Sequence, residues 1–170
     1  GFFVDNLHLE DLNPINCGWH QRDSLRRFGP GIRDHYILHY VLSGKGTFTC
    51  GGRTYPLEAS GLFLIRPGEM VGYEADEEDP WGYAWIGFEG RAAETLLEKA
   101  GFMGETRTAV LPETRACFQR IRQSDPDRPF SALRLCRYLY TVFTVLEEQS
   151  TALYSAGRTP ALYAHRAAEY

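Results

Sequence analysis

The stretch from Tyr36 to Glu89 constrains the fold more than any other part of the chain, because it divides into short apolar segments separated by turn residues. The turns include the pair Gly51-Gly52 and the acidic run that ends in Pro80. Short strands at even spacing, joined by turns of this kind, are typical of a closed or double-sheet β-barrel. We therefore expect a small β-barrel in this part of the chain.

Alternation and turn signals predict where the strands lie. The expected strands span residues 15–23, 35–43, 47–50, 53–57, 62–66, 70–75 and 81–88. Residues 35–43 are apolar or aromatic on both faces, which is expected of a strand that is covered on both sides. Residues 24–34 contain Gly29, Pro30 and Gly31, so we expect an irregular loop there.

After Gly90 the pattern changes to a helical period, with expected helices over residues 91–100, 112–123 and 130–149. The last helix is apolar around most of its circumference, which favours burial on two sides, by its own barrel and by a second chain. The alternative is a helix that is merely well buried within one domain. The expected dimerisation residues are Leu135, Tyr138, Leu139, Val142, Val145 and Leu146.

Length and charge limit the classes of function. A chain of 170 residues fits one domain, or one domain and part of a second. Its net charge of −4 gives no field that would attract nucleic-acid phosphates, so this chain alone is not expected to bind DNA. No apolar run approaches the ~20 residues that span a bilayer, so no membrane partner is expected. Scattered cysteines without metal-ligand spacing favour a reducing cytoplasm.

A barrel of this kind often binds a metal through histidines that project inward from neighbouring strands. The histidines here are His8, His20, His35, His39 and His165. His35 and His39 share a face of one strand but lie about 13 Å apart in an extended chain, too far to ligate one ion together. No nucleophile elbow, phosphate-binding loop or dinucleotide fingerprint is present. We therefore expect no metal, no cofactor and no enzymatic activity.

The remaining chemistry is that of binding. Sugars are bound by aromatic faces that pack on their C–H surfaces and by planar donors such as arginine. On a strand, Trp81, Tyr83 and Trp85 point to one side, and Tyr73 and Arg33 can join them. The alternative is that these rings simply fill the barrel. The polar groups of tyrosine and tryptophan need partners when buried, which favours a lined pocket.

Three segments carry a resemblance to a known family: YILHYVLSGKG, PLEASGLFLIRPGE and PWGYAWIGFEG. Together with the helical tail, the chain from about residue 14 to 149 resembles the N-terminal ligand-binding and dimerisation domain of AraC-type transcriptional regulators. The resemblance implies a mainly β fold with some α, in which a cupin-type jelly-roll β-barrel is followed by two or three helices, one of them a dimerisation helix. It also implies a helix-turn-helix DNA-binding domain after them.

The resemblance also implies site residues. In the arabinose-responsive member an arginine, a tyrosine, a histidine and a tryptophan contact the sugar. The corresponding positions here are Arg33, Tyr73, Tyr83 and Trp85, which are the expected ligand-binding residues. Tyr83 stands where that member has a histidine, which weakens the case for arabinose itself.

The expected organisation is an N-terminal arm over residues 1–12, a ligand-binding barrel over 13–90, a helical dimerisation region over 91–150, and over 151–170 a linker with the start of a truncated DNA-binding domain. The expected partners are a small-molecule effector, for which we expect a carbohydrate, and a second copy of the chain. Operator DNA, and RNA polymerase for the full-length protein, are expected only through the missing domain. Two rival interpretations stay open: a cupin enzyme acting on a sugar or small acid, and a ligand-independent dimerisation domain.

Overall fold

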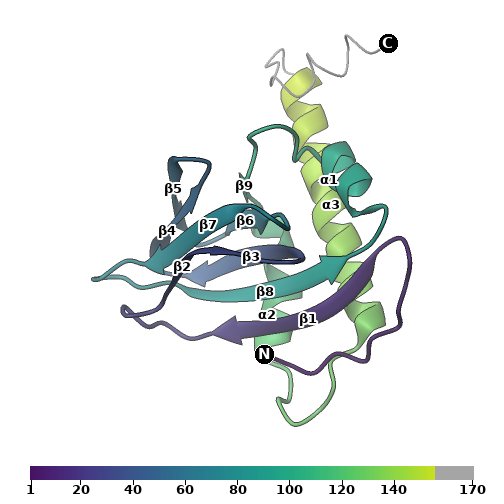
Figure 1. Ribbon diagram of the computed structural model, residues 1–170, viewed down its shortest axis with the longest axis horizontal. Coiled ribbons are helices and arrows are strands. Elements are labelled where there is room, and N and C mark those ends of the chain that lie inside the picture. Colours follow the sequence, from purple (N-terminus) through teal and green to yellow (C-terminus); the bar gives the residue numbers. More distant parts are fainter. Residues whose placement is uncertain (156–170) are drawn as a thin grey trace.

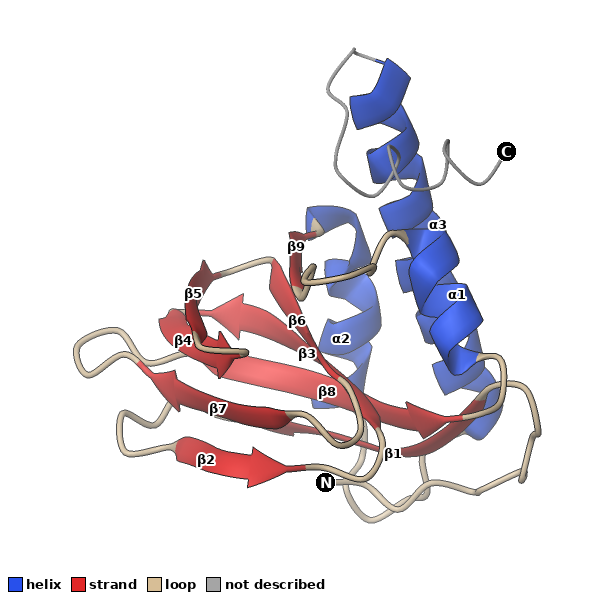
Figure 2. Cartoon of the chain, turned by 45° about the horizontal axis from the view of Figure 1, so that its top comes forward, coloured by secondary structure: helices blue, strands red, loops and turns tan. Residues whose placement is uncertain are grey.

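In the computed structural model, which describes residues 1–155, nine strands form two antiparallel sheets that face each other (Figures 1 and 2). One sheet has the order β1 (Asn13–His20), β8 (Gly82–Glu89), β3 (Tyr36–Ser43), β6 (Gly61–Ile65) and β9 (Thr108–Val110). The other has the order β2 (Arg27–Ile32), β7 (Met70–Ala75), β4 (Lys45–Cys50) and β5 (Arg53–Glu58). The expected cupin-type jelly-roll barrel is confirmed.

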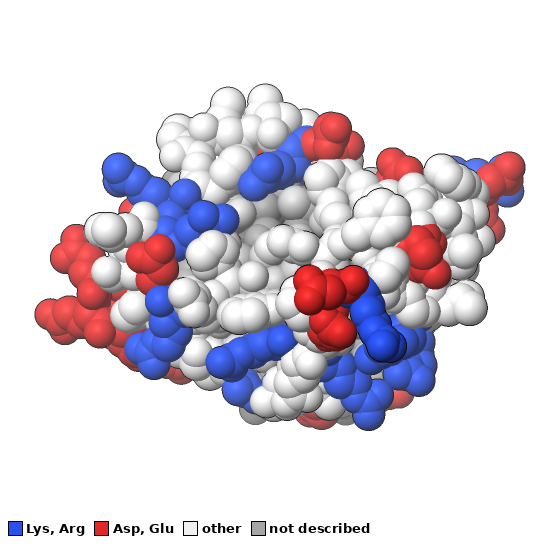
Figure 3. Space-filling view, turned by 90° about the horizontal axis from the view of Figure 1, so that it is seen from below, with Lys and Arg blue, Asp and Glu red and all other residues white. Residues whose placement is uncertain are grey.

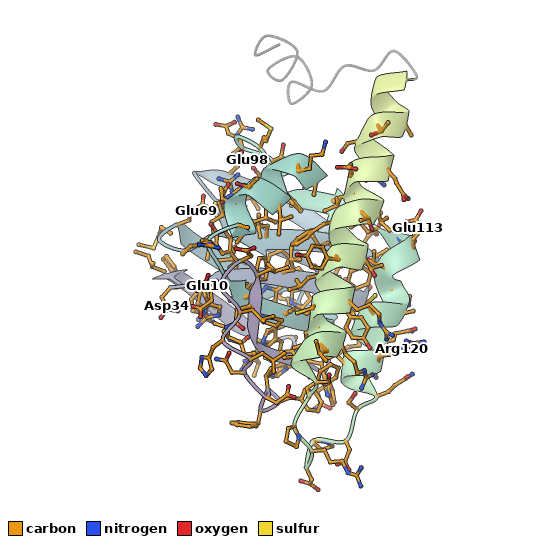
Figure 4. The ribbon with its side chains drawn as sticks, turned by 90° about the vertical axis from the view of Figure 1, so that its right-hand side faces the viewer. Glu10, Asp34, Glu69, Glu98, Glu113 and Arg120 are labelled. Carbon is orange, nitrogen blue, oxygen red and sulfur yellow. The ribbon has the colours of Figure 1, made fainter. Side chains whose placement is uncertain are left out.

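The helices cover the outer face of the five-stranded sheet and leave the four-stranded sheet uncovered (Figure 2). They are α1 (Ala93–Ala100), the short 3-10 helix η1 (Pro112–Thr114), α2 (Arg115–Arg122) and α3 (Ala132–Ser155). Seen from the helix side in Figure 4, α3 runs between α1, marked by Glu98, and α2, marked by Arg120. The three expected helices are therefore present, and α3 extends beyond the expected end at residue 149.

The five-stranded sheet separates two hydrophobic cores because successive side chains of a strand point to opposite faces. On β3, Leu38 and Tyr40 pack against the helices, whereas Ile37 and Val41 lie inside the barrel. The ring of Tyr40 stacks on Phe118 of α2 at 4.6 Å, and its hydroxyl donates a hydrogen bond to a backbone carbonyl. This arrangement confirms the expectation of a strand that is covered on both sides.

The loop that was expected over residues 24–34 contains a strand, so that expectation was wrong. β2 pairs with β7, and its register shifts between Phe28 and Gly31. Proline is tolerated there because β2 is an edge strand and an irregular register releases the residues between from ladder hydrogen bonding. Gly29 has a φ of +89°, a left-handed conformation that glycine adopts without strain.

The helical region also contributes a strand that the sequence pattern did not predict. β9 is three residues long and pairs with β6 at the edge of the five-stranded sheet. Thr108 and Ala109 are half-buried and Val110 is exposed, so no alternation distinguishes them from a loop. Their pairing shows that the segment between α1 and η1 returns to the edge of the five-stranded sheet.

The residues expected to form the dimer interface lie inside their own chain. Four of the six are at most 1% exposed, Leu146 is 5% exposed, and Val145 packs against the same core. The expectation that this face is available to a second chain is therefore wrong, because it covers the five-stranded sheet. The exposed side of α3 instead presents Leu133 and Tyr140, which are 70% and 45% exposed.

The N-terminal segment lies against both layers of the molecule. The amide of Phe2 donates a hydrogen bond to the carbonyl of Cys17 on β1, at 2.8 Å. The amide of Phe130, just before α3, donates to the carbonyl of Phe3 at 2.7 Å. Phe2 and Val4 are buried in the core beneath the helices. We call residues 1–12 the arm.

The expected linker and truncated domain fall, from residue 156 onward, outside the described residues. Within the described part, none of the helices has the length and apolar character needed to cross a membrane.

Candidate ligand-binding site in the barrel

Aromatic rings from both sheets fill the barrel, and three of the four expected ligand residues belong to this cluster. β8 supplies Tyr83 and Trp85, and β7 supplies Tyr73 from the opposite sheet. Ring centroids are 6.1 Å apart for Tyr83 and Trp85, and 6.2 Å apart for Tyr73 and Tyr83. Trp81, just before β8, belongs to the same cluster and is 1% exposed, which confirms the prediction that Trp81, Tyr83 and Trp85 point to one side.

His39 of β3 lies at the centre of the cluster and is 2% exposed. Its ring stacks on Phe63, with the centroids 4.6 Å apart and the planes inclined by 5°. The rings of Tyr73 and Tyr83 lie 4.9 Å and 5.2 Å away. Trp85 is 6.3 Å away. His39 therefore touches every aromatic residue that was expected to bind the ligand.

Arg33 reaches the cluster from the turn between β2 and β3. Its guanidinium carbon lies 3.9 Å from the centroid of the Phe28 ring, a cation–π contact, and Phe28 in turn stacks on Tyr73 at 5.3 Å. The carbonyl of Arg33 accepts a hydrogen bond from the amide of Gly68, which ties this turn to the turn before β7. The Nε atom of Arg33 is buried and has no hydrogen-bond partner among the described residues.

Trp85 forms the half-buried edge of the cluster, next to the arm. Its indole Nε1–H donates a hydrogen bond to Asn16 Oδ1 at 3.2 Å, and the Asn16 amide lies 3.2 Å from His35 Nε2. A Cβ atom on Gly18 would come within 2.5 Å of the Trp85 ring, so only glycine fits there. A Cβ atom on Gly1 would lie 3.3 Å from the same ring. The start of the arm thus borders on Trp85.

Burial controls the protonation of this interior. It lowers the pKa of His39 from 6.5 to about 3, with a further contribution from the positive charge of Arg33. Burial also raises the pKa of Tyr83, an effect that the nearby Tyr73 strengthens and that Arg26 partly offsets. At neutral pH the imidazole and the phenol are therefore both uncharged, and they can exchange hydrogen bonds with a neutral ligand.

Two surface hollows lie near the barrel, and neither is lined by Arg33, His39, Tyr83 or Trp85. A hollow of about 590 Å³ is lined by Phe28 and Tyr73, together with residues of β4 and of the turns around Gly29 and Gly51. Another, of about 1280 Å³, lies along β4, β5, β7 and the start of β9. Figure 3 looks from below at the side where the N-terminus lies in Figure 1, and it shows a concave region with an uncharged floor and with both basic and acidic side chains around it.

The described residues include no group of three or more histidine, cysteine, aspartate or glutamate side chains arranged to hold a metal ion. His39 lies in the aromatic cluster, whereas His35 is bonded to Asn16 and to the exposed Asp34. The donor set of the interior is therefore one imidazole, one guanidinium and phenol hydroxyls, which suits an organic ligand better than a cation.

Sequence reasoning named Tyr73, Tyr83 and Trp85 of this aromatic cluster, but it did not name the central His39 or the Phe28 beneath Arg33 as members of it. His39 was considered only as a metal ligand. The available signal was its position on the strand. His39 lies between Leu38 and Tyr40, which face the helices, so its side chain must point to the barrel side of β3, as that of Ile37 does. Phe28 gave no usable signal, since it lies in a strand that was taken for a loop.

Comparison with known families gives one match over most of the chain. The model of the AraC-like ligand binding domain matches residues 13–143. This range begins at the first residue of β1 and ends within α3, so it includes the barrel and the helices that cover it.

Three curated relatives are operon regulators. The Msm operon regulatory protein of Streptococcus mutans is 40% identical over 99 residues, which are 58% of this chain and 34% of that protein. The lactose operon transcription activator of Staphylococcus xylosus is 27% identical over 153 residues, 86% of this chain and 54% of that protein. The raffinose operon transcriptional regulatory protein of Pediococcus pentosaceus is 41% identical over 61 residues, 35% of this chain and 22% of that protein. The chain thus spans about half or less of each relative.

Proposed function

Because this chain belongs to the AraC-like ligand-binding domain family, we propose that it is the effector-sensing domain of an operon regulator and that it binds a sugar or related small molecule inside the barrel. The observation that carries the proposal is the interior cluster, in which Tyr73, Tyr83 and Trp85 surround His39 beside Arg33, whose Nε atom has no hydrogen-bond partner among the described residues. A barrel that only needed filling would use apolar side chains without polar groups.

Each expected residue has a role that follows from its chemistry. The Trp85 ring offers a face for the C–H surface of a sugar, since its Nε1–H is already bonded to Asn16. Tyr73 and Tyr83 offer hydroxyls, and Arg33 offers planar donors. Two of the relatives regulate operons that are named for lactose and for raffinose, which supports a carbohydrate as the effector.

The arm is the proposed moving part. Gly1 borders on Trp85, and Phe2 packs on Phe130 with ring centroids 5.7 Å apart. The Asp5 carboxylate accepts a hydrogen bond at 2.6 Å from the amide of Ala132, at the start of α3. The arm therefore links the ligand residues to the helix that leads out of the domain. Ligand that orders or displaces the arm would shift the population of α3 arrangements.

The partners follow from this function. We expect a homodimer, and operator DNA and RNA polymerase are expected to bind through a further domain, as in a cytoplasmic regulator. The described exposed surface of α3, with Leu133 and Tyr140, is the proposed contact with the second copy. The DNA and polymerase partners are proposed for a protein of the relatives' length, of which this chain spans about half or less.

The proposal is tested by a thermal-shift screen of lactose, raffinose, melibiose, galactose and glucose on the purified chain. A sugar present at 100 times its dissociation constant adds ~2.7 kcal/mol to the unfolding free energy. We expect at least one of these sugars to raise the melting temperature, and we expect Trp85→Ala to weaken its binding at least tenfold while the protein stays folded. The matched control is Trp19→Ala, which removes a tryptophan that is 36% exposed on β1.

Two outcomes would contradict the proposal. If no compound in the screen binds, the chain is not a sugar sensor. The second outcome is that Trp85→Ala loses ~3–5 kcal/mol of stability, the cost of truncating a core tryptophan, while the variant that remains folded binds the sugar as tightly as the wild type. Trp85 would then only fill the core.

A further inference from the structure

Three buried polar atoms in or beside the aromatic cluster lack hydrogen-bond partners among the described residues. They are His39 Nδ1, Arg33 Nε and Trp81 Nε1, and the first two belong to side chains that can pair with a hydroxyl group of a ligand. A buried polar group without a partner is rare in folded proteins, because it has lost its hydrogen bonds to water and no bond within the protein compensates for that free-energy cost. Such an atom in a binding domain indicates a missing bonding partner.

The other unpaired atoms of the described chain have a different setting. Those of Arg66, Glu69 and Arg107 belong to side chains that already form ion pairs, Arg66 with Glu94 and Arg107 with Glu69. His39 and Arg33 have no side-chain hydrogen bond or ion pair within the described residues. Both side chains pack against the faces of aromatic rings. Those rings fill the space beside them but offer no lone pair that could accept a hydrogen bond in the plane of the imidazole or the guanidinium.

Aromatic contacts connect the two side chains. Arg33 lies over Phe28, Phe28 stacks on Tyr73, and Tyr73 lies 4.9 Å from His39. The Asp34 carboxylate, which interacts electrostatically with Arg33, is exposed. A molecule that enters between Trp85 and Phe28, the two half-buried edges of the cluster, would meet both side chains.

We propose that His39 is a specificity-determining residue of the ligand site, whose Nδ1 atom at the floor of the barrel pairs with a hydroxyl group of the bound sugar while Arg33 binds the same part of the molecule. This inference rests on the proposed function, and it adds a residue that the family resemblance did not assign. A neutral imidazole presents one donor and one acceptor, and a hydroxyl group can both donate and accept. A sugar hydroxyl therefore suits His39 in either tautomer.

The consequence is discrimination against analogues that lack this hydroxyl. A site built to bond a polar group of its ligand rejects a deoxy analogue strongly, because its own buried polar atoms are then left unpaired. Apolar packing on Trp85 cannot supply such discrimination. His39 would thus set which sugar is recognised, and Trp85 would set how tightly sugars bind in general.

The test uses the sugar that gives the largest thermal shift with the wild-type chain, titrated by calorimetry into three variants. His39→Phe keeps a planar ring against Phe63 but removes both ring nitrogens. His39→Asn keeps a hydrogen-bonding atom near the position of Nδ1. The control is His8→Asn, a change at an exposed histidine whose positive φ of 53° asparagine tolerates.

We expect His39→Phe to weaken binding at least tenfold, His39→Asn to restore most of that loss, and His8→Asn to have no effect. Nitrogen NMR of the imidazole gives a second readout, since the Nδ1 resonance of His39 should shift when the sugar is added. Urea unfolding of each variant shows whether a loss of binding is only a loss of folded protein.

The outcomes separate the two proposals. If the wild-type chain binds a sugar and folded His39→Phe binds it equally well, His39 has no role in recognition and this inference is overturned. It is overturned as well if His39→Asn binds no better than His39→Phe and the Nδ1 resonance does not move. If the wild-type chain binds none of the sugars, the proposed function fails and this inference fails with it.

Discussion

At the scale of single residues, His39 shows how burial fixes a charge state. In the unfolded chain this imidazole would titrate near 6.5, and burial holds its pKa at about 3 in the folded protein. The unfolded state therefore takes up the proton first as the pH falls. Stability attributable to His39 is fully present above about pH 6.5 and is lost as the pH falls from there towards 3.

This titration gives a measurable prediction. Between pH 6.5 and pH 5 a single proton bound only in the unfolded state lowers the unfolding free energy by about 2 kcal/mol. Urea unfolding at pH 7 and at pH 5 should show that wild-type protein loses about that much more than His39→Phe, which has no proton to bind. His8→Asn should lose as much as the wild type. Parallel losses in all three proteins would show that His39 titrates normally and is not buried as described.

At the scale of elements, the arm is bound to α3 by more than apolar contact. Asp5 accepts a hydrogen bond from the amide of Ala132, in addition to the local cap in which Ser131 Oγ accepts from the amide of Arg134. The first amides of a helix have no partner within the helix, and a carboxylate also interacts favourably with the positive end of the helix dipole. A residue 127 positions away in sequence thus contributes to the start of α3.

Asp5→Ala is expected to cost about 1 kcal/mol of stability, the usual cost of removing a helix cap. Asp5→Asn should cost less, because its amide oxygen can still accept the hydrogen bond. Urea unfolding measures both, and Asp127→Ala, in the exposed loop before α3, serves as the matched control. Equal stability of Asp5→Ala and the wild type would show that the arm does not cap α3 in solution.

The strands differ in how well they could be predicted from the sequence. The strands β7 and β8 and the aromatic positions upon them followed from the sequence, because alternate side chains of a strand share one face. β2 was missed because glycine and proline are read as breakers, and only pairing with β7 shows that the irregular register accommodates them. β9 is too short to carry a pattern. His39 was missed because its role depends on contacts with rings from other strands, and the sequence of β3 alone does not show those contacts.

At the scale of the whole molecule, one sheet belongs to two cores, and this determines which surfaces remain for a partner. The helices occupy one face of the five-stranded sheet, so the most apolar side of α3 faces inward. The exposed residues of α3 include a stripe at positions 133, 137, 140 and 144, spaced as neighbours on one face of a helix. Its two apolar members, Leu133 and Tyr140, are the large exposed hydrophobics of α3 in the described chain.

If this stripe is the dimer contact, charge placed upon it should separate the copies without unfolding them. Sedimentation equilibrium of the double variant Leu133→Asp, Tyr140→Asp should show a dissociation constant at least tenfold higher than that of the wild type, since each buried carboxylate would lose its hydration. The variant should unfold at a urea concentration close to that of the wild-type monomer. Leu139→Ala provides the contrast, because this residue is 0% exposed in the core beneath α3, and its truncation should instead cost about 2–5 kcal/mol of stability. A wild-type chain that stays monomeric at high concentration, or a double variant that dimerises as tightly as the wild type, would place the contact elsewhere on the molecule.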